Sequence, residues 1–189
     1  MKRDAQATRA RIRAAATAEF AAHGIAGARV DRIAATAGAN KNMIYIYFGS
    51  KEQLFDAVFS EAIGELLDTV PIDAADLPRY AGELYDHMVV HPELSRLARW
   101  HGLERPGGLG VLESVRTSTG AKIAAIARAQ ADGLVSIGLS ADQLVGVLLA
   151  IAATWSAGAP ELERESPPPE VVASRRAAVV WAVDRLIAP

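Results

Sequence analysis

Residues 30–47, VDRIAATAGANKNMIYIY, have the spacing of two short helices that cross at a tight turn. Two helices that cross steeply need a small residue at the crossing, a glycine in the turn and branched apolar residues that seal the angle. Ala34 is the small residue, and Gly38 can adopt the positive φ that other residues resist. Ile33 and Ile44 are placed to seal the angle. The stretch therefore predicts a helix-turn-helix.

The second helix of this motif has two chemically different faces when its residues are placed about 100° apart. The face that we expect to be buried is apolar and consists of Ile44, Tyr47 and Phe48. The opposite face consists of Asn42, Tyr45 and Ile46, flanked by Lys41 and Met43. It offers an amide, a phenol, a cation and apolar groups, which are the types that read bases in a major groove. An ordinary helical hairpin, the alternative, explains the turn but not this surface.

The basic residues gather at the N-terminal end of a chain whose formal charge is only −2. Residues 1–51 hold nine Lys and Arg against three Asp and Glu, a net charge of +6, and the remainder carries −8. Such an asymmetry favours a contact with nucleic acid or another anionic surface at the N-terminal end. Chance clustering of solvated charges is the alternative.

The composition of the 189 residues favours an all-α protein with a sizeable core, since 51% are apolar and 38 are alanine, the strongest helix former. No stretch alternates as a strand does. Ser50 with Gln53, and Ser140 with Gln143, form capping-box patterns at two helix starts. About nine helices are expected, over residues 5–22, 30–37, 41–48, 51–67, 74–90, 92–103, 111–132, 141–157 and 169–187.

Several functional classes lack their sequence signals. The chain has no cysteine, which excludes disulfides, thiolate zinc sites and cysteine nucleophiles. It has no G-x-S-x-G or HExxH motif, and its histidines lack a metal-site pattern, so we expect no enzyme, no metal and no cofactor. The charged N-terminus does not fit a signal peptide, and no uncharged run reaches the ~20 apolar residues that span a bilayer. We expect a cytoplasmic protein.

Over roughly residues 8 to 60 the sequence resembles the TetR family of bacterial transcriptional regulators. The family signature is an amphipathic helix, an IA-x-x-AG helix-turn-helix, LYxYF and SKE-x-LF. This chain matches at Phe20, Gly24, Val30, Ile33-Ala34, Ala37-Gly38, Ile44-Tyr45, Tyr47-Phe48, Ser50-Lys51-Glu52 and Leu54-Phe55. The resemblance is specific because many spaced positions agree at once. Beyond residue 70 it rests on helix layout alone.

The resemblance implies which residues meet DNA. The expected contacts are Arg29, Asn40, Lys41, Asn42, Met43, Tyr45, Tyr47 and Lys51. Asn40 is the N-cap of the second helix, Tyr47 can reach a phosphate, and Lys51 is a phosphate clamp at the next helix start. Family members usually carry Thr or Ser near positions 28–29, Gly near 42, Thr near 43 and often His at 46. This chain has Ala28-Arg29, Asn42, Met43 and Ile46, so the operator cannot be inherited from relatives.

The chain is expected to divide into a helix-turn-helix DNA-binding domain over residues 1–50, a connecting helix over 51–70, and a regulatory and dimerisation domain over 71–189. Members of the family pair as homodimers through their last two helices. Two apolar stripes favour this independently. They are Leu144, Leu148, Ile151 and Trp155 on one helix, and Val172, Val179, Val183 and Leu186 on the last. Burial of both stripes within a monomer is the alternative.

In related proteins the helices between the connecting helix and the dimer seam enclose an effector pocket. Candidate lining residues are Tyr80, Leu84, His87, Met88, Trp100, His101 and Trp155. Leu84 and Met88 also fit an ordinary core, and the histidines also fit surface or cap positions.

We therefore expect a homodimeric regulator that binds double-stranded DNA at a palindromic operator, a repressor released by a small-molecule effector, with no membrane contact. Two alternatives stay open. One is a DNA-binding regulator without an effector, whose C-terminal part only dimerises. The other is a helical interaction protein with a vestigial helix-turn-helix.

Overall fold

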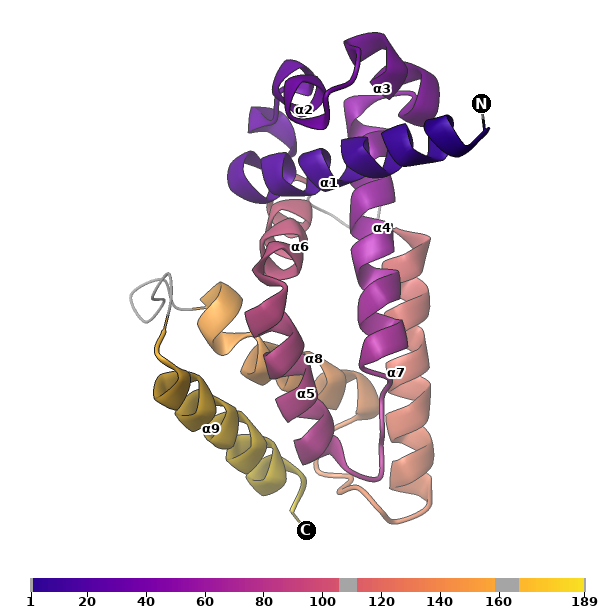
Figure 1. Ribbon diagram of the computed structural model, residues 1–189. Helices are drawn as coiled ribbons and strands as arrows, with labels where there is room; N and C mark the ends of the chain where they lie inside the picture. The colour runs from indigo at the N-terminus through magenta and orange to yellow at the C-terminus, as the bar shows by residue number, and fades with distance from the viewer. Residues whose placement is uncertain (1, 106–111, 159–166, 189) are drawn as a thin grey trace.

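The computed structural model describes residues 2–105, 112–158 and 167–188, which form helices and no β-strand (Figure 1). The predicted all-α class is confirmed. The elements are α1 (Lys2–Gly27), α2 (Val30–Ala37), α3 (Lys41–Phe48), α4 (Lys51–Thr69), α5 (Leu77–Val90), α6 (Pro92–Glu104), α7 (Glu113–Ala131), α8 (Ala141–Ala152), the π-helical turn η2 (Thr154–Gly158) and α9 (Pro169–Ile187).

Four predicted boundaries differ from the structure by three residues or more. Helix α1 begins at Lys2 rather than at residue 5. Helix α5 begins at Leu77 rather than at residue 74, because the Asp76 side chain caps it and Pro78 occupies its first turn. Helix α8 ends at Ala152 rather than at 157, before the π-helical turn. Helix α1 continues to Gly27 across a break at Gly24, which was expected to end it. The expected start of α7 at residue 111 lies outside the described residues.

Helices α1, α2 and α3 form a compact group, which we call the head (residues 2–50), at one end of the molecule (Figure 1). Ile12, Phe20 and Ile44 are fully buried in its core. The ring of Phe20 meets that of Phe55 from α4 edge to face, with centroids 5.3 Å apart. The aromatic pair therefore fixes the first helix of the head to the helix that leaves it.

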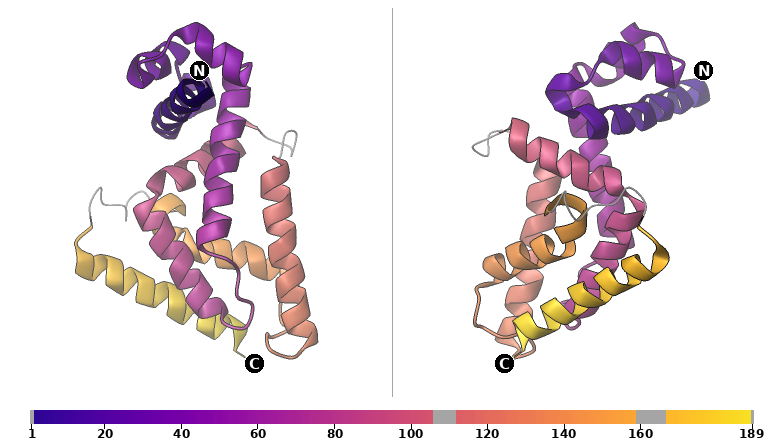
Figure 2. Two further views of the ribbon diagram at one scale, coloured as in Figure 1. Left: turned by 45° about the vertical axis from the view of Figure 1, so that its right-hand side comes forward. Right: turned by 90° about the vertical axis from the view of Figure 1, so that its left-hand side faces the viewer.

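Helix α4 runs from the head along the length of the rest of the molecule, which we call the body (residues 71–188; Figure 2). The Ser50 side chain caps its first turn by accepting from the Gln53 N–H at 3.1 Å, as predicted. Its buried residues continue the head core into the body, because one cluster of buried side chains runs from Ile12 in α1 to Val183 in α9.

In the body, α5 packs between α8 and α9, and α7 lies beside α4 (Figures 1 and 2). Helix α9 lies at one edge of the body against α5 and α8, and α7 lies at the opposite edge, so one side of α9 faces away from the chain (Figure 1). Among the described helices, none combines the length and the apolar character that a bilayer crossing requires.

Candidate nucleic-acid interface

The turn between α2 and α3 has the geometry that the sequence predicts. Gly38 adopts a left-handed conformation with φ 58°, and its N–H donates to the Ala35 carbonyl at 3.2 Å. A Cβ at this position would meet nothing within 4 Å, so the backbone conformation and not the space calls for glycine. Asn40 then caps α3 by accepting from the Asn42 N–H at 2.9 Å.

The two faces of α3 are separated as expected. Ile44 and Phe48 are buried against the head core. On the opposite side Asn42 is exposed, and Tyr45 and Ile46 leave 43% and 72% of their surface in solvent. Met43 and Tyr47 are half-buried and pack against the core, so Tyr47, which was expected on the buried face, keeps part of its surface in solvent. Asn42, Tyr45 and Ile46 therefore form the outward face of α3, a name kept for these three residues.

Lys41 lies beside this outward face and is paired with an acidic neighbour. Its Nζ is 2.9 Å from Asp31 Oδ1 on α2. The hydrogen bond from Lys41, followed by its positive charge, lowers the pKa of Asp31. The same hydrogen bond raises the pKa of Lys41. Both groups are exposed, and an exposed pair is weak enough for a phosphate to displace the carboxylate.

Lys51 holds the α1–α2 connection. Its Nζ donates to the carbonyls of Ala26 and Ala28, both at 3.2 Å. It was expected to clamp a phosphate, but its nitrogen is already engaged with the backbone. Its charge stays uncompensated because carbonyls are neutral, so Lys51 still adds to the positive field of the head.

Other basic residues of the head also serve the fold. Arg9 Nη2 donates to the Tyr47 carbonyl at 3.1 Å, and Arg11 Nε donates to the Ala37 carbonyl at 3.1 Å. These bonds hold the ends of α3 and α2 against α1. Arg29 is exposed, and its guanidinium makes no hydrogen bond or ion pair within the described part of the chain.

Carboxylates neutralise two more arginines of the head. Arg32 lies 2.7 Å from Glu19 Oε1, and Arg13 lies 3.0 Å from Glu61 Oε2. The hydrogen bond from Arg32 is the largest cause of the lowered pKa of Glu19. The net charge of +6 already counts Glu19, but Glu61 lies outside residues 1–51, so the Arg13–Glu61 pair lowers the positive charge that is free to meet an anion.

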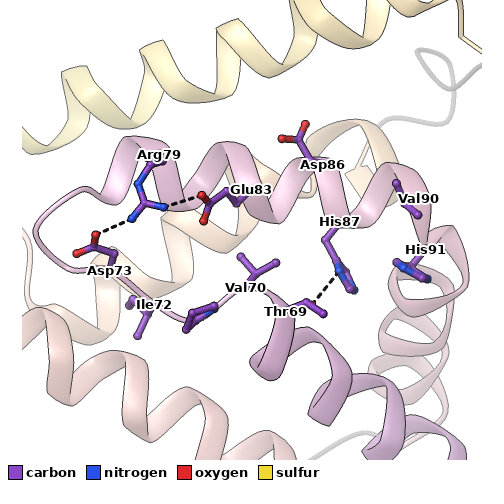
Figure 3. A pocket seen from close by; sticks show the side chains of 11 residues that line it. Thr69, Val70, Ile72, Asp73, Arg79, Glu83, Asp86, His87, Val90 and His91 are labelled. Atoms are coloured by element: carbon purple, nitrogen blue, oxygen red, sulfur yellow. Dashed lines mark hydrogen bonds and ion pairs between the residues drawn. The ribbon is translucent and has the colours of Figure 1, made fainter.

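In the body, a groove of about 750 Å³ opens between the end of α4 and one side of α5 (Figure 3). Its lining consists of Thr69, Val70, Pro71, Ile72, Asp73, Arg79, Glu83, Asp86, His87, Val90 and His91. Arg79 reaches both Asp73 and Glu83 at 2.6 Å (Figure 3). The groove thus combines apolar groups with paired charges.

His87 is one of the seven residues expected to line an effector pocket, and it lies in this groove. Its Nδ1 is 3.4 Å from Thr69 Oγ1, and its ring centroid is 4.6 Å from that of His91 (Figure 3). Burial, followed by the neighbouring His91, lowers the pKa of His87. The neutral ring is therefore the form that this part of the groove favours.

None of the other six expected effector residues lines this groove. Tyr80 and Leu84 are buried in the core, and the Tyr80 Oη has no hydrogen-bond partner among the described residues. Trp155 packs edge to face on Tyr85, and the sulfur of Met88 lies 3.6 Å from Ser156 Oγ. Trp100 lies against α1, where its Nε1 donates to the Ala21 carbonyl at 3.2 Å, and the His101 ring stacks on Phe55 of α4.

The residues expected at the dimer seam are largely used within one chain. Leu144, Leu148, Val179 and Val183 are buried in the core of the body. Ile151, Trp155, Val172 and Leu186 are half-buried and pack against that core. Helical periodicity identified these stripes correctly, but it could not distinguish a partner chain from the rest of the same chain. The apolar side chains that α8 and α9 do expose are Val147 and Trp181, the latter with 62% of its surface in solvent.

No group of three or more His, Asp or Glu side chains in the described ranges is arranged to hold a metal ion. The polar groups on and beside the outward face of α3 are the Asn42 amide, the Tyr45 phenol and the Lys41 ammonium, which is paired with Asp31. This arrangement can bind an extended anion and can exchange hydrogen bonds with the edges of bases.

Two family models match the chain, and together they cover most of it. Residues 12–58 match the model described as bacterial regulatory proteins, tetR family. Residues 76–185 match the model described as tetracyclin repressor-like, C-terminal domain. The first range contains α2, α3 and the outward face of α3, and the second runs from the cap of α5 into α9.

Relatives of known name agree with these matches. The HTH-type transcriptional repressor SCO4008 of Streptomyces coelicolor is 42% identical over 163 residues, which are 86% of this chain and 84% of that protein. The solved structure of SCO4942 from the same organism is 39% identical, with a TM-score of 0.80 over 95% of this chain and 98% of that one. The fatty acid degradation regulator FadR of Bacillus halodurans shares the fold, with a TM-score of 0.68 at 18% identity over 90% and 96% of the two chains. The chain therefore belongs to the tetR family of bacterial regulatory proteins, a family of helix-turn-helix transcriptional regulators that bind DNA.

Proposed function

We propose that the protein is a homodimeric repressor that reads a palindromic operator with α3 of each protomer. The observation that carries the proposal is the outward face of α3, which stays exposed while the rest of α3 holds the head together. The Asn42 amide can pair with an adenine edge, and Ile46 can touch a thymine methyl group. The related protein SCO4008 is named as a repressor, which supports this direction of regulation.

DNA contacts outside the bases are proposed for Arg29, Lys41, Tyr45, Tyr47 and the N-terminus of α3 at Asn40. Arg29 and Lys41 are exposed cations close to the outward face. Lys51 is proposed to act at a distance, through its charge, because its Nζ is bound to backbone carbonyls. Because its DNA partner lies in the cytoplasm, we place the protein there.

Dimerisation is proposed through the exposed sides of α8 and α9. A short recognition helix contacts few base pairs, and a two-fold dimer doubles the site. Trp181 and Val147 are large apolar side chains left in solvent on these helices. Changing Trp181 to Lys should convert the dimer to a monomer in light scattering. Changing Ile137 to Lys, at an exposed apolar residue of the α7–α8 connection, is the control and should leave the dimer intact.

Release by a small-molecule effector is proposed to occur through the groove beside α5. Its volume exceeds the ~300 Å³ at which ligand pockets begin. The absence of the other six expected residues from the lining of this groove favours a second candidate, a regulator whose body only dimerises. A ligand that weakens operator binding in wild type but not in a Val90→Glu variant of the groove supports the first candidate. A ligand that is equally effective on both proteins argues against this groove.

The test of DNA recognition is selection from random DNA fragments by the purified full chain, followed by sequencing. The fragments should share a palindrome whose half-sites are about one helical turn apart. Fragments without a common motif contradict sequence-specific binding. An affinity that does not change with salt favours the interaction protein with a vestigial helix-turn-helix.

A further inference from the structure

The C-terminal end of α6 contacts two helices, α1 of the head and α4, which leaves the head. Glu104 Oε2 accepts from the Ala26 N–H of α1 at 2.8 Å. The next residue, Arg105, lies 2.6 Å from Asp56 Oδ1 on α4, and its guanidinium lies 5.4 Å from the centroid of the Phe55 ring. One turn earlier, Trp100 contacts α1 at the Ala21 carbonyl, and His101 stacks on Phe55 of α4. We call Trp100, His101, Glu104 and Arg105 the α6 latch.

The latch is built around the break in α1. Gly24 has φ 70° and ψ −175°, which interrupts the helix between its long first part and its last turn. A residue with a side chain is strained at that φ, and a Cβ there would collide with the Glu104 carboxylate and lie 2.8 Å from Trp100 Cε3. The amides that follow a helix break need an acceptor from outside the helix, and Glu104 supplies one to Ala26. A carboxylate of the body therefore caps a helix of the head.

The capped segment is also held from α4. Lys51 Nζ donates to the carbonyls of Ala26 and Ala28, two residues before α2 begins at Val30. The last turn of α1 and its connection to α2 are thus held by one carboxylate from α6 and one ammonium from α4, in addition to the Glu19 carboxylate of α1, which accepts from the Arg29 N–H at 2.8 Å. Because α2 and α3 follow directly, the direction of the outward face of α3 depends on where these two groups hold the segment.

The latch is also joined to the groove of the body by a single helix. Helix α6 begins at Pro92, next to His91 of the groove, and its thirteen residues extend about 20 Å to Glu104. Arg105 keeps only 16% of its side chain in solvent, so water competes little for its bond to Asp56. A shift of α6 along or about its axis must move the latch groups relative to α1.

We propose that the α6 latch sets the angle of the head on the body, with Glu104 as the positioning residue for the recognition helices. The inference rests on the proposed function, since it concerns two heads that must meet two half-sites together. A dimer discriminates half-site spacing only when each head is held firmly. The latch is therefore measured by spacing selectivity, the ratio of affinities for the selected operator and for the same operator lengthened by one base pair.

The experiment compares full-length wild type, Glu104→Ala, Glu104→Gln and Arg96→Ala. Loss of the carboxylate should reduce spacing selectivity about fivefold. The amide oxygen of Gln still accepts from Ala26, so Glu104→Gln should retain selectivity. Arg96 is an exposed residue of the same helix, and its variant should behave as wild type. Hydrogen exchange of the Ala26 amide should accelerate in Glu104→Ala and remain slow in Glu104→Gln.

Trp100→Phe provides a second, milder variant in case Glu104→Ala does not fold. It keeps an aromatic ring, although a smaller one, and removes the Nε1 donor to the Ala21 carbonyl, so it should also reduce selectivity. If the folded variants keep wild-type selectivity while wild type binds its operator, the latch inference is overturned and the proposed function stands. If wild type shows no specific binding to any selected DNA, the proposed function is overturned, and the latch inference falls with it.

Discussion

The head and the body differ in how they use their apolar residues. On α3 in the head, Ile46 leaves 72% of its surface in solvent while Ile44, two residues earlier, is fully buried. On α8 in the body, Leu144 and Leu148 are both buried in the same chain. An apolar stripe that is buried within the same chain says little about partner molecules. An exposed set of side chains that the fold does not need, such as the outward face of α3, says much more about them.

The largest effect should come from the two isoleucines of α3. Ile44→Ala should cost about 3 kcal/mol of unfolding free energy, because it leaves a cavity in the head core. Ile46→Ala should change that free energy by no more than about 0.5 kcal/mol. Urea denaturation of both variants measures the difference. Equal losses would mean that the two faces of α3 are assigned incorrectly.

Asn42→Ala tests whether the outward face of α3 reads the DNA sequence. Removal of the amide should reduce discrimination at one base position of each half-site by about 1–3 kcal/mol, with little change elsewhere. Competition binding against operators with single base changes measures this. A uniform loss over all positions would place Asn42 on the phosphates instead of the bases.

Tyr80→Phe tests whether the body has an internal polar group that the fold does not use. The phenol is buried, its Oη has no partner among the described residues, and burial raises its pKa. Replacement by Phe should leave stability unchanged or raise it by about 1 kcal/mol, because an unsatisfied buried donor is removed. Thermal unfolding provides the measurement. A clear loss of stability would reveal a partner for the hydroxyl in solution.

Asp31→Asn should strengthen DNA binding through the head. The change removes a negative charge beside the outward face and releases Lys41 from its ion pair. Affinity should rise about threefold for specific and unrelated DNA alike, and more at low salt. Asp68→Asn, an exposed carboxylate at the far end of α4, is the control and should have a smaller effect. Weaker binding by Asp31→Asn would show that the pair itself orders the reading surface.

The smallest effect concerns His87 in the groove. Burial lowers its pKa, so below about pH 6.5 the unfolded chain takes up a proton that the folded chain resists. Stability should therefore fall as the pH decreases from 7 toward 5, and this fall should be smaller in His87→Gln. Denaturant unfolding at several pH values measures both slopes. If the unfolding free energies of wild type and His87→Gln change in parallel with pH, His87 is excluded as a source of the pH dependence of stability.

The sequence predicts features whose causes are local. The turn at Gly38, the cap at Asn40 and the cap at Ser50 each depend on residues within a few positions, and the structure confirms all three. At Ser140 the N–H donates to Gln143 Oε1 at 3.1 Å, as the capping box predicts. Propensity and spacing are sufficient for such features because no distant contact competes with them.

The roles of Lys51, Trp100 and Glu104 could not be predicted, because their partners lie 25, 79 and 78 positions away in the chain. Trp100 was assigned to an effector pocket because it is an aromatic residue of the body, yet it meets α1. The same reason explains the dimer residues: periodicity shows that a face is buried but does not identify the element that covers it.

The central claim is that the head reads DNA through the outward face of α3. It is tested most directly by the affinity of wild type and Asn42→Ala for the selected operator and for a scrambled fragment, each at several salt concentrations. For wild type, log K should fall linearly with log salt on both fragments, with the operator bound much more tightly at every concentration. Asn42→Ala should keep the same slope of log K against log salt and should reduce the difference in affinity between the operator and the scrambled fragment. An affinity that does not change with salt would contradict the claim. So would a difference in affinity between the two fragments that Asn42→Ala leaves unchanged.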